Sequence, residues 1–491
     1  MKNKNELTDE ILNRIKTISY TAIECENYNK AFSAISFIGR YLYEYNQFYT
    51  EDELESYLAI ISDTLRDKWS RVKNYKASEN ILLYDGFGLD TRGVVLMYLN
   101  ALGLNGYKVT YVTNRSVSNS IPTIGSMCSK YGIDMRFIDF KNYVEWTNQL
   151  TDVFETVKPK AAFFYTTPFD VSGIAAFHMY KGFVDRYLID LTDHAFWLGK
   201  SAVDYFLGSR DMSAALQFYH RGIKKEQMIK LGVNLLVEDI KDHSGLPFDP
   251  TEAEYIFSGG SLYKTLGDEE NRFYKIVDHI LKNHSNIKFL YAGTGDKSEM
   301  KKILDKYPNR AFLINERKDF YYLIEHSILY LNTFPMFGGM MMKYCGLAKK
   351  LPITLKHNND SDGLLLNQSK CKIEYDSYDE LISDIDRLID DSKYRESREA
   401  LLEGSVITED RFKNNIRGVI ENHKTDYEHE FIDLDTSLFR KEYYERFNYN
   451  DQMIEMVKRI NISLLCDFPQ IFIKGLFIKS ARKIKNKIGV K

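Results

Sequence analysis

The sequence predicts an α/β protein with two Rossmann-like, doubly wound domains whose ligand loops face a shared cleft. Runs of β-branched and aromatic residues at 81–84 and 328–331 each lead into a glycine turn and then into an apolar-periodic stretch, which is the order strand, loop, helix. Strands and helices also alternate twice along the chain, from 81 to about 235 and again from 255. A chain of 491 residues is too long for one hydrophobic core, so two or three domains are expected.

Helical patterns flank the alternating regions at both ends. Residues 1–75 lack strand signals and carry apolar residues at helical spacing, so we expect a helical N-terminal extension. The first α/β domain is expected over 76–240 and the second over 250–424, followed by a helical C-terminal segment over 425–491. The expected strands are 81–84, 108–113, 135–140, 161–165 and 186–191 in the first domain and 255–257, 288–292, 311–313, 328–331 and 352–354 in the second.

The composition is that of a folded protein with a small net charge. Hydrophobic residues make up 44% of the chain, and the formal charge of -3 argues against a general nucleic-acid binder. The five cysteines form no C-x-x-C pair, and their odd number favours a reducing compartment over a disulfide framework. The N-terminus lacks an apolar signal segment, and no stretch approaches the length of a transmembrane helix. We therefore expect a cytoplasmic protein.

The last 21 residues differ from the rest of the chain. Segment 471–491 contains seven basic residues and no acidic residue, interleaved with isoleucine, leucine and phenylalanine. A basic amphipathic end of this kind can lie on an anionic membrane surface, so we expect peripheral association with the inner face of the plasma membrane. The alternative is a solvated basic tail whose apolar start is docked on the protein.

Glycine turns after predicted strands mark the candidate ligand loops, because ligands bind outside the carboxyl ends of the strands in open α/β sheets. Glycine lets backbone N–H groups face a ligand, and the N-terminus of a following helix favours an anion. The residues selected on this basis are Gly86, Gly88 and Arg92 in the first domain and Gly260, Lys264, Arg317, Gly338 and Gly339 in the second.

Three of these segments resemble the GT-B fold of two-domain glycosyltransferases. Residues 86–93 are similar to the glycine-rich first loop of the acceptor domain, and residues 255–264 resemble the opening strand and loop of the donor domain. Residues 334–339 and 346–352 resemble the P-x-x-G-G…G-x-P block, especially that of O-linked N-acetylglucosamine transferases and bacterial protein N-glycosyltransferases. That block often continues with a Glu that binds the donor sugar or ribose, whereas 340–345 contains no acid here.

The resemblance covers residues 81–420 and implies a hexosyltransferase that takes a UDP-linked sugar as substrate and needs no further cofactor. Backbone amides at a helix start, together with Lys264 or Arg317, can neutralise the leaving diphosphate without a metal ion. The alternative for the two cations is a solvated surface charge. For Gly338 and Gly339 the alternative is a structural turn.

His194 is the first candidate for catalysis. It follows the predicted strand at 186–191, in a segment similar to a His-containing acceptor-domain loop of some bacterial glycosyltransferases. A neutral imidazole near a hydroxyl can take its proton, with an Asp holding the tautomer. Asp90 is the second candidate base. The structural alternatives are a helix-capping or seam position for His194 and a helix cap for Asp90.

Other catalytic motifs are absent from the sequence. It contains no phosphate-binding G-x-x-x-x-G-K-[ST] loop, no Cys/His metal cluster and no G-x-S-x-G elbow. We therefore expect a metal-independent transferase that moves a sugar to a glycan, a lipid-linked sugar or a protein in bacterial capsule or other cell-surface polysaccharide assembly. The alternatives are a sugar-nucleotide epimerase and a non-catalytic, sugar-binding or partner-stabilising protein on the same scaffold.

Overall fold

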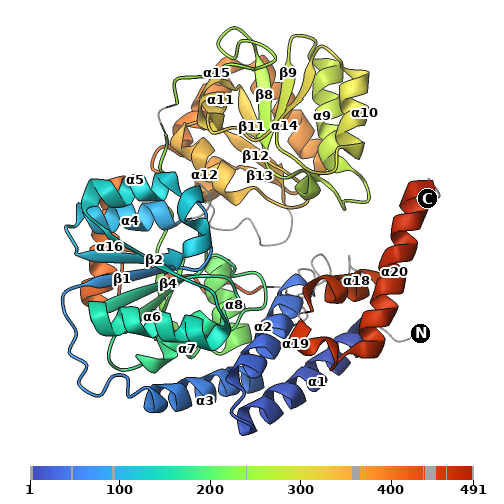
Figure 1. Ribbon diagram of the computed structural model, residues 1–491. Helices are drawn as coiled ribbons and strands as arrows, with labels where there is room; N and C mark the ends of the chain where they lie inside the picture. Colours follow the sequence, from blue (N-terminus) through green and yellow to red (C-terminus); the bar gives the residue numbers. More distant parts are fainter. Residues whose placement is uncertain are drawn as a thin grey trace. The chain divides into compact units, whose positions relative to one another are not determined.

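The computed structural model describes residues 4–45, 48–90, 94–238, 240–356, 365–366, 368–434, 436, 449–460 and 462–488. The chain divides into two compact units (Figure 1). Each unit contains one parallel sheet, which confirms the prediction of two doubly wound α/β domains. The first unit comprises Met1–Ser209, Ser213–Leu231 and Lys413–Lys491, and the second comprises Arg210–Met212 and Gly232–Phe412.

The first unit is built on a seven-stranded sheet in the order β3-β2-β1-β4-β5-β6-β7. Its strands are β1 (Ile81–Asp85), β2 (Val109–Asn114), β3 (Asp134–Ile138), β4 (Ala161–Tyr165), β5 (Asp185–Ile189), β6 (Tyr205–Gly208) and β7 (Met228–Lys230). The direction of winding reverses between β1 and β4, where Ile81 pairs with Ala161, so the loops that follow these two strands are neighbours. The sequence pattern did not predict the short strands β6 and β7.

Helices cover both faces of this sheet. They are α4 (Val95–Leu104), α5 (Pro122–Tyr131), α6 (Tyr143–Val157), α7 (Val171–Met179), α8 (Asp211–Arg221) and α16 (Glu409–Asn422). Figure 1 shows α4 and α5 on one face and α6 and α7 on the other. The hydroxyl of Tyr187 on β5 donates to the carbonyl of Val419 at 3.0 Å, which fixes α16 to the first unit. The second domain was expected to run to 424, whereas the chain returns to the first unit at Lys413.

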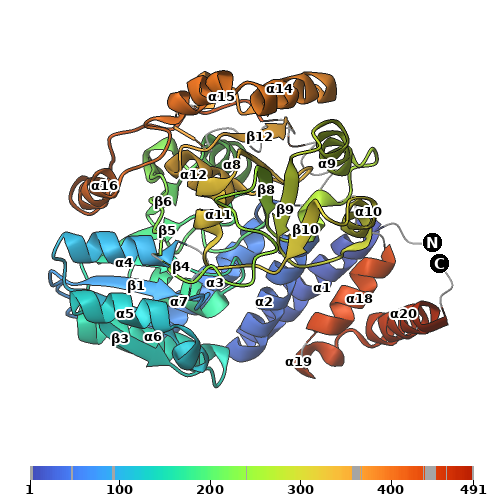
Figure 2. The ribbon, with the colours of Figure 1, turned by 90° about the horizontal axis from the view of Figure 1, so that it is seen from above.

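Helices from the two ends of the chain belong to the first unit. They are α1 (Lys4–Glu24), α2 (Tyr28–Tyr45), α3 (Asp52–Lys68), α18 (Tyr449–Arg459), α19 (Ile462–Leu465) and α20 (Pro469–Ile488). Figure 2 shows α1 and α2 side by side, with α18 next to them and α20 next to α18. Among the described residues, no helix is both long and apolar enough to span a bilayer.

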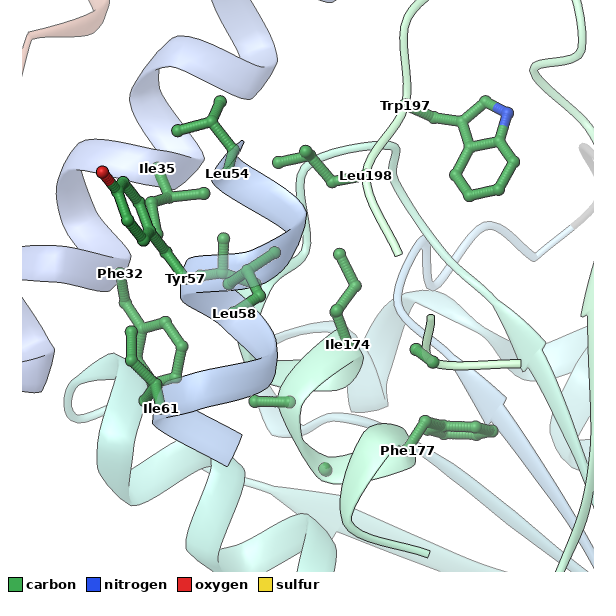
Figure 3. Close-up of a cluster of buried hydrophobic side chains, with 14 of the residues drawn as sticks. Phe32, Ile35, Leu54, Tyr57, Leu58, Ile61, Ile174, Phe177, Trp197 and Leu198 are labelled. Atoms are coloured by element: carbon green, nitrogen blue, oxygen red, sulfur yellow. The ribbon is translucent and has the colours of Figure 1, made fainter. Parts of the chain in front are cut away.

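The N-terminal helices share the hydrophobic core of the first domain. Leu54 and Leu58 of α3 are buried close to Ile174 of α7 and to Leu198, which lies in the loop after β5 (Figure 3). Burying a leucine or isoleucine side chain contributes about 1.5–3 kcal/mol. The extension is therefore a packed layer of the first domain, and it contacts the loop that carries His194.

The second unit contains a six-stranded parallel sheet in the order β10-β9-β8-β11-β12-β13. Its strands are β8 (Tyr255–Gly259), β9 (Lys288–Ala292), β10 (Ala311–Ile314), β11 (Leu329–Leu331), β12 (Pro352–Leu355) and β13 (Glu374–Tyr375). Its helices of seven or more residues include α9 (Arg272–Asn283), α10 (Ser298–Lys306), α11 (Phe320–His326), α12 (Gly339–Leu347), α14 (Tyr378–Asp390) and α15 (Ser392–Glu399). The order again reverses between β8 and β11, so the loops after these strands are neighbours.

Candidate functional site

The loop after β8 makes a close approach to the loop after β9. Gly260 has a φ of +128°, which favours glycine, and the N–H of Leu262 donates to the carbonyl of Thr294 at 2.9 Å. A Cβ on Gly293 would stand 1.9 Å from the Gly260 carbonyl oxygen, so glycine is required there. The two loops can follow this path only because neither residue has a side chain.

The loop after β11 is shaped by a buried amide. Asn332 accepts a hydrogen bond from the N–H of Gly338 at 3.0 Å and donates to the sulfur of Met342 at 3.0 Å. The hydroxyl of Thr333 donates to the carbonyl of Met336 at 2.7 Å. These bonds close the loop on itself and bring Gly338 to the N-cap position of α12. The sequence analysis did not single out Asn332, although an Asn directly after a strand is a common loop-closing residue.

Lys264 joins the two loops of the second unit. Its ammonium group donates to the carbonyl of Phe337 at 3.1 Å, and its own carbonyl accepts from the N–H of Met336 at 3.2 Å. The structure therefore brings Lys264 next to Gly338 and Gly339, at the start of α12. A lysine ammonium and the first N–H groups of a helix both favour a phosphate group. Binding of a diphosphate here stays a prediction.

Arg317 lies in a different arrangement. Its guanidinium binds both carboxylate oxygens of Asp319 at 2.7 Å and donates to the carbonyl of Ser244 at 3.0 Å. Asp319 also contacts the imidazole of His243 at 3.0 Å, and Arg317 holds its pKa below the usual range. These bonds tie the loop after β10 to the segment that precedes β8. A phosphate-binding role for Arg317 stays a prediction, and the contacts give it a structural role.

In the first unit, Asp85 shapes the glycine loop after β1. One carboxylate oxygen accepts from the N–H groups of Phe87 and Gly88 at 2.9 Å each, and the other accepts from the Tyr111 hydroxyl at 2.7 Å. Burial raises the pKa of Asp85. A Cβ on Gly86 would stand 2.0 Å from the Thr166 hydroxyl, so Gly86 is required by the neighbouring loop. Gly88 has a φ of +61°, which favours glycine, so the turn itself explains both Gly86 and Gly88.

Asp90 is bound to the start of a helix. Its carboxylate accepts a hydrogen bond from the N–H of Ile124 at 3.0 Å, in the first turn of α5. The sequence analysis considered a cap of the next helix along the chain, and the contact is instead to the helix after β2. The catalytic role of Asp90 stays a prediction. Arg92, the other polar candidate of this loop, lies outside the described residues.

His194 lies in the loop after β5, with 27% of its side chain exposed. Its Nδ1 is 3.6 Å from a carboxylate oxygen of Asp193, which is longer than a hydrogen bond of good geometry. Its ring is 6.4 Å from the ring of Tyr43 on α2, between ring centres. The imidazole is therefore accessible, next to a carboxylate, and beside an aromatic side chain from the N-terminal extension.

A buried arginine holds the backbone on both sides of His194. Arg221 of α8 donates to the carbonyls of Asp193, at 2.9 Å, and Ala195. Burial lowers the pKa of Arg221 to about 10, so it stays charged at neutral pH. The carboxylate of Asp190 completes the network, with its pKa raised by burial first and by Asp193 second. The sequence offered no signal for Arg221, because it lies on a different helix from the loop that it holds.

Glu55 of α3 holds the next part of the same loop. Its carboxylate accepts from the N–H of Gly199 at 2.7 Å and of Lys200 at 3.3 Å, and its side chain is buried. Burial raises the pKa of Glu55 to about 7. The loop from 193 to 200 is thus held by Arg221 of α8 and Glu55 of α3.

This chain has the GT-B fold, which is built from two α/β domains. Each domain contains one parallel sheet, and the order of its strands reverses next to a strand that leads into a glycine loop. Protein-family models and curated proteins give no match to the sequence. Among solved structures, a UDP-N-acetylglucosamine 2-epimerase matches 74% of this chain and all of its own at 12% identity, with a TM-score of 0.51. A glycosyltransferase from Rickettsia africae matches 71% of this chain and all of its own at 10% identity, also with a TM-score of 0.51. At these identities the similarity shows the fold.

Proposed function

We propose that the protein is an enzyme that binds a UDP sugar at the second unit and transfers the sugar to a glycan, a lipid-linked sugar or a protein. The observation that carries the proposal is the contact of Lys264 with Phe337, directly before Gly338 and the start of α12. A cation and a helix N-terminus converge there, and a nucleoside diphosphate is the ligand that needs both. The GT-B neighbours named as a glycosyltransferase and a UDP-sugar epimerase support this choice.

The donor site is tested by calorimetric titration with UDP. We expect Lys264→Met and Gly339→Val to weaken UDP binding about tenfold or more, since a charge-assisted hydrogen bond contributes about 1.5–3 kcal/mol. Lys301→Met is the matched control, because Lys301 is an exposed lysine on α10 of the same unit. Unchanged UDP affinity in folded Lys264→Met and Gly339→Val variants would show that the donor site lies elsewhere.

An epimerase is the second candidate, and it is favoured by the neighbour named UDP-N-acetylglucosamine 2-epimerase. The two activities differ in their products. A transferase releases UDP from the donor when an acceptor is present, whereas an epimerase returns an intact UDP sugar with one stereocentre inverted. Incubation with UDP-N-acetylglucosamine and analysis of the nucleotide products by chromatography and NMR separates them. A chain that binds UDP sugars and forms neither product would be a non-catalytic sugar-binding protein.

We also propose that α20 binds an anionic lipid surface and places the enzyme at a membrane-linked acceptor. One face of α20 packs on α18 through Gly475, where a Cβ would meet Val457 at 2.4 Å. The opposite face carries Ile473 and Phe477, which are 55% and 73% exposed. Exposed basic side chains, including Lys474 and Lys479, lie on the same helix, and 471–491 has no acidic residue. Apolar insertion and attraction to anionic headgroups act together on such a helix.

Sedimentation with vesicles of phosphatidylglycerol and phosphatidylcholine tests the lipid proposal. We expect binding that weakens with added salt, because salt screens surface charge. Ile473→Ser combined with Phe477→Ser should release the protein while UDP binding persists. Tyr219→Ser is a control for the loss of an exposed aromatic group, since Tyr219 is 55% exposed on α8. Failure of the wild-type protein to sediment at low salt would leave α20 as a solvated helix.

A further inference from the structure

The C-terminal half of α2 lies directly against the two loops that follow β4 and β5. The Ser36 hydroxyl donates to the carbonyl of Phe169 at 3.1 Å, in the loop after β4. A Cβ on Gly39 would stand 2.9 Å from Leu198 and 3.1 Å from the side chain of Phe169. Ligands of open α/β sheets bind outside the carboxyl ends of the strands. Helix α2 therefore borders the ligand side of the first sheet.

Four side chains meet at this border. The ring of Tyr43 lies 6.3 Å from the ring of Phe169 and 6.4 Å from the imidazole of His194, between ring centres. The guanidinium carbon of Arg40 lies 5.4 Å from the centre of the Phe169 ring. Residues Arg40 and Tyr43 are three positions apart on α2, so both side chains lie on one face of the helix. The result is a continuous row from the cation Arg40 to the imidazole of His194.

Arg40 is exposed, and within the described part of the chain no carboxylate lies within ion-pair distance of it. This separates it from Arg66 and Arg71 of the same extension, which pair with aspartates. A planar guanidinium with open donors suits phosphate or carboxylate oxygens. Its stacking on Phe169 fixes its direction, which reduces the entropy that binding an anion would cost.

We propose that Arg40 and Tyr43 form an acceptor subsite for an anionic saccharide. The proposal rests on the proposed transferase function. The Tyr43 ring offers an apolar surface to the face of a sugar, Arg40 binds the negative group, and His194 lies within the same row to meet an accepting hydroxyl. The negative group is a phosphate or a carboxylate, which share this chemistry. The N-terminal extension, which precedes the residues 81–420 that carry the sequence resemblance, thereby contributes to acceptor choice.

The test is a ligand-observed NMR titration with glucose 1-phosphate, glucuronate and glucose, each with and without saturating UDP. Saturating UDP blocks the donor site, so the remaining signal reports the acceptor side. We expect glucose 1-phosphate or glucuronate to bind the wild-type protein at least tenfold more tightly than glucose. The comparison of the two anions identifies the source of the charge.

Matched variants locate the site. Arg40→Gln should lose the preference for the anion, whereas Arg14→Gln should keep it. Arg14 is the matched control because it is an exposed arginine of the same N-terminal extension. Its guanidinium carbon also lies 5.2 Å from the centre of a phenylalanine ring, that of Phe468. Tyr43→Phe should retain binding and Tyr43→Ala should lose it. Equal binding of the three sugars, or an unchanged preference in a folded Arg40→Gln variant, overturns the inference. Failure of the wild-type protein to bind UDP would instead refute the proposed donor function. The sugar titration without UDP would then still show whether Arg40 and Tyr43 bind an anionic saccharide.

Discussion

The buried carboxyl of Glu55 gives a quantitative prediction for the loop that carries His194. Glu55 comes from α3, and its Oε1 accepts from the N–H groups of Gly199 and Lys200. Its second oxygen, Oε2, is buried and has no hydrogen-bond partner. A protonated carboxyl keeps the acceptor oxygen and leaves no charge in the core, so the folded protein favours the neutral form.

The size of the effect follows from the pKa of Glu55. Burial raises it from the ordinary value of 4.5 to about 7. The folded chain therefore binds more protons than the unfolded chain in this pH interval, and the free energy of unfolding falls as pH rises from about 4.5 to about 7. At about 1.36 kcal/mol per pKa unit, Glu55 alone removes about 3 kcal/mol of stability over the full interval. Above about pH 7 its contribution no longer changes.

The variant Glu55→Gln isolates this contribution, because the amide oxygen can accept from Gly199 and cannot titrate. Urea unfolding from pH 5 to pH 8 measures the free energy of unfolding of both proteins. We expect the variant to gain about 2–3 kcal/mol relative to the wild-type protein between these two pH values. Glu325→Gln is the control, since Glu325 is exposed on α11.

Parallel pH profiles for the wild-type protein and Glu55→Gln would refute the reasoning, because they would mean that Glu55 is charged in both states. Hydrogen exchange adds a local measurement. Protection of the amides of Gly199 and Lys200 should fall with rising pH, beyond the chemical pH dependence, in the wild-type protein alone.

Three shorter predictions follow from single contacts. Gly293→Ala should abolish UDP binding or unfold the second unit, since its Cβ would stand 1.9 Å from the Gly260 carbonyl; normal UDP titration would contradict the loop geometry. Asp90→Ala should lower stability by about 0.5–2 kcal/mol through loss of the α5 cap, measured by thermal unfolding; a 100-fold loss of transfer in a stable variant would instead mark Asp90 as a base. His194→Ala should lower transfer by about 10²-fold or more with UDP binding intact, and His326→Ala, an exposed histidine of the second unit, should not.

The sequence was sufficient for the elements that local pattern determines. Apolar runs followed by glycine turns predicted β1, β8 and β11, and their neighbours in each sheet followed from the same alternation. The strands β6, β7 and β13 were not predicted, and length alone does not explain this, since β10 and β12 with four residues and β11 with three were predicted. Local sequence pattern also could not predict that α16 packs on the first unit, because that position depends on distant contacts such as the hydrogen bond from Tyr187 to Val419.

For the candidate site, glycine positions could be predicted and supporting side chains could not. Lys264 and Gly338 were selected from the sequence and the structure brings them together. Arg317 was selected because it follows a strand, but an aspartate two residues later takes its guanidinium. Glu55 and Arg221 contact the loop at 193–200 from positions far away in the chain, so no spacing rule could relate them to it.

These distant contacts decide what the N-terminal extension is. A detachable appendage would touch the domain through polar surface groups, whereas here Leu58 is buried near Ile174 and Glu55 supplies acceptors to a loop next to the strand ends (Figure 3). Removing the extension would expose the apolar face of α7 and leave the N–H groups of Gly199 and Lys200 without their acceptor. The loop that carries His194 would lose its support from α3, while Arg221 would still bind the carbonyls of Asp193 and Ala195. The N-terminal helices are thus part of the structure that orients His194, and changes in them should alter acceptor handling before they alter nucleotide binding.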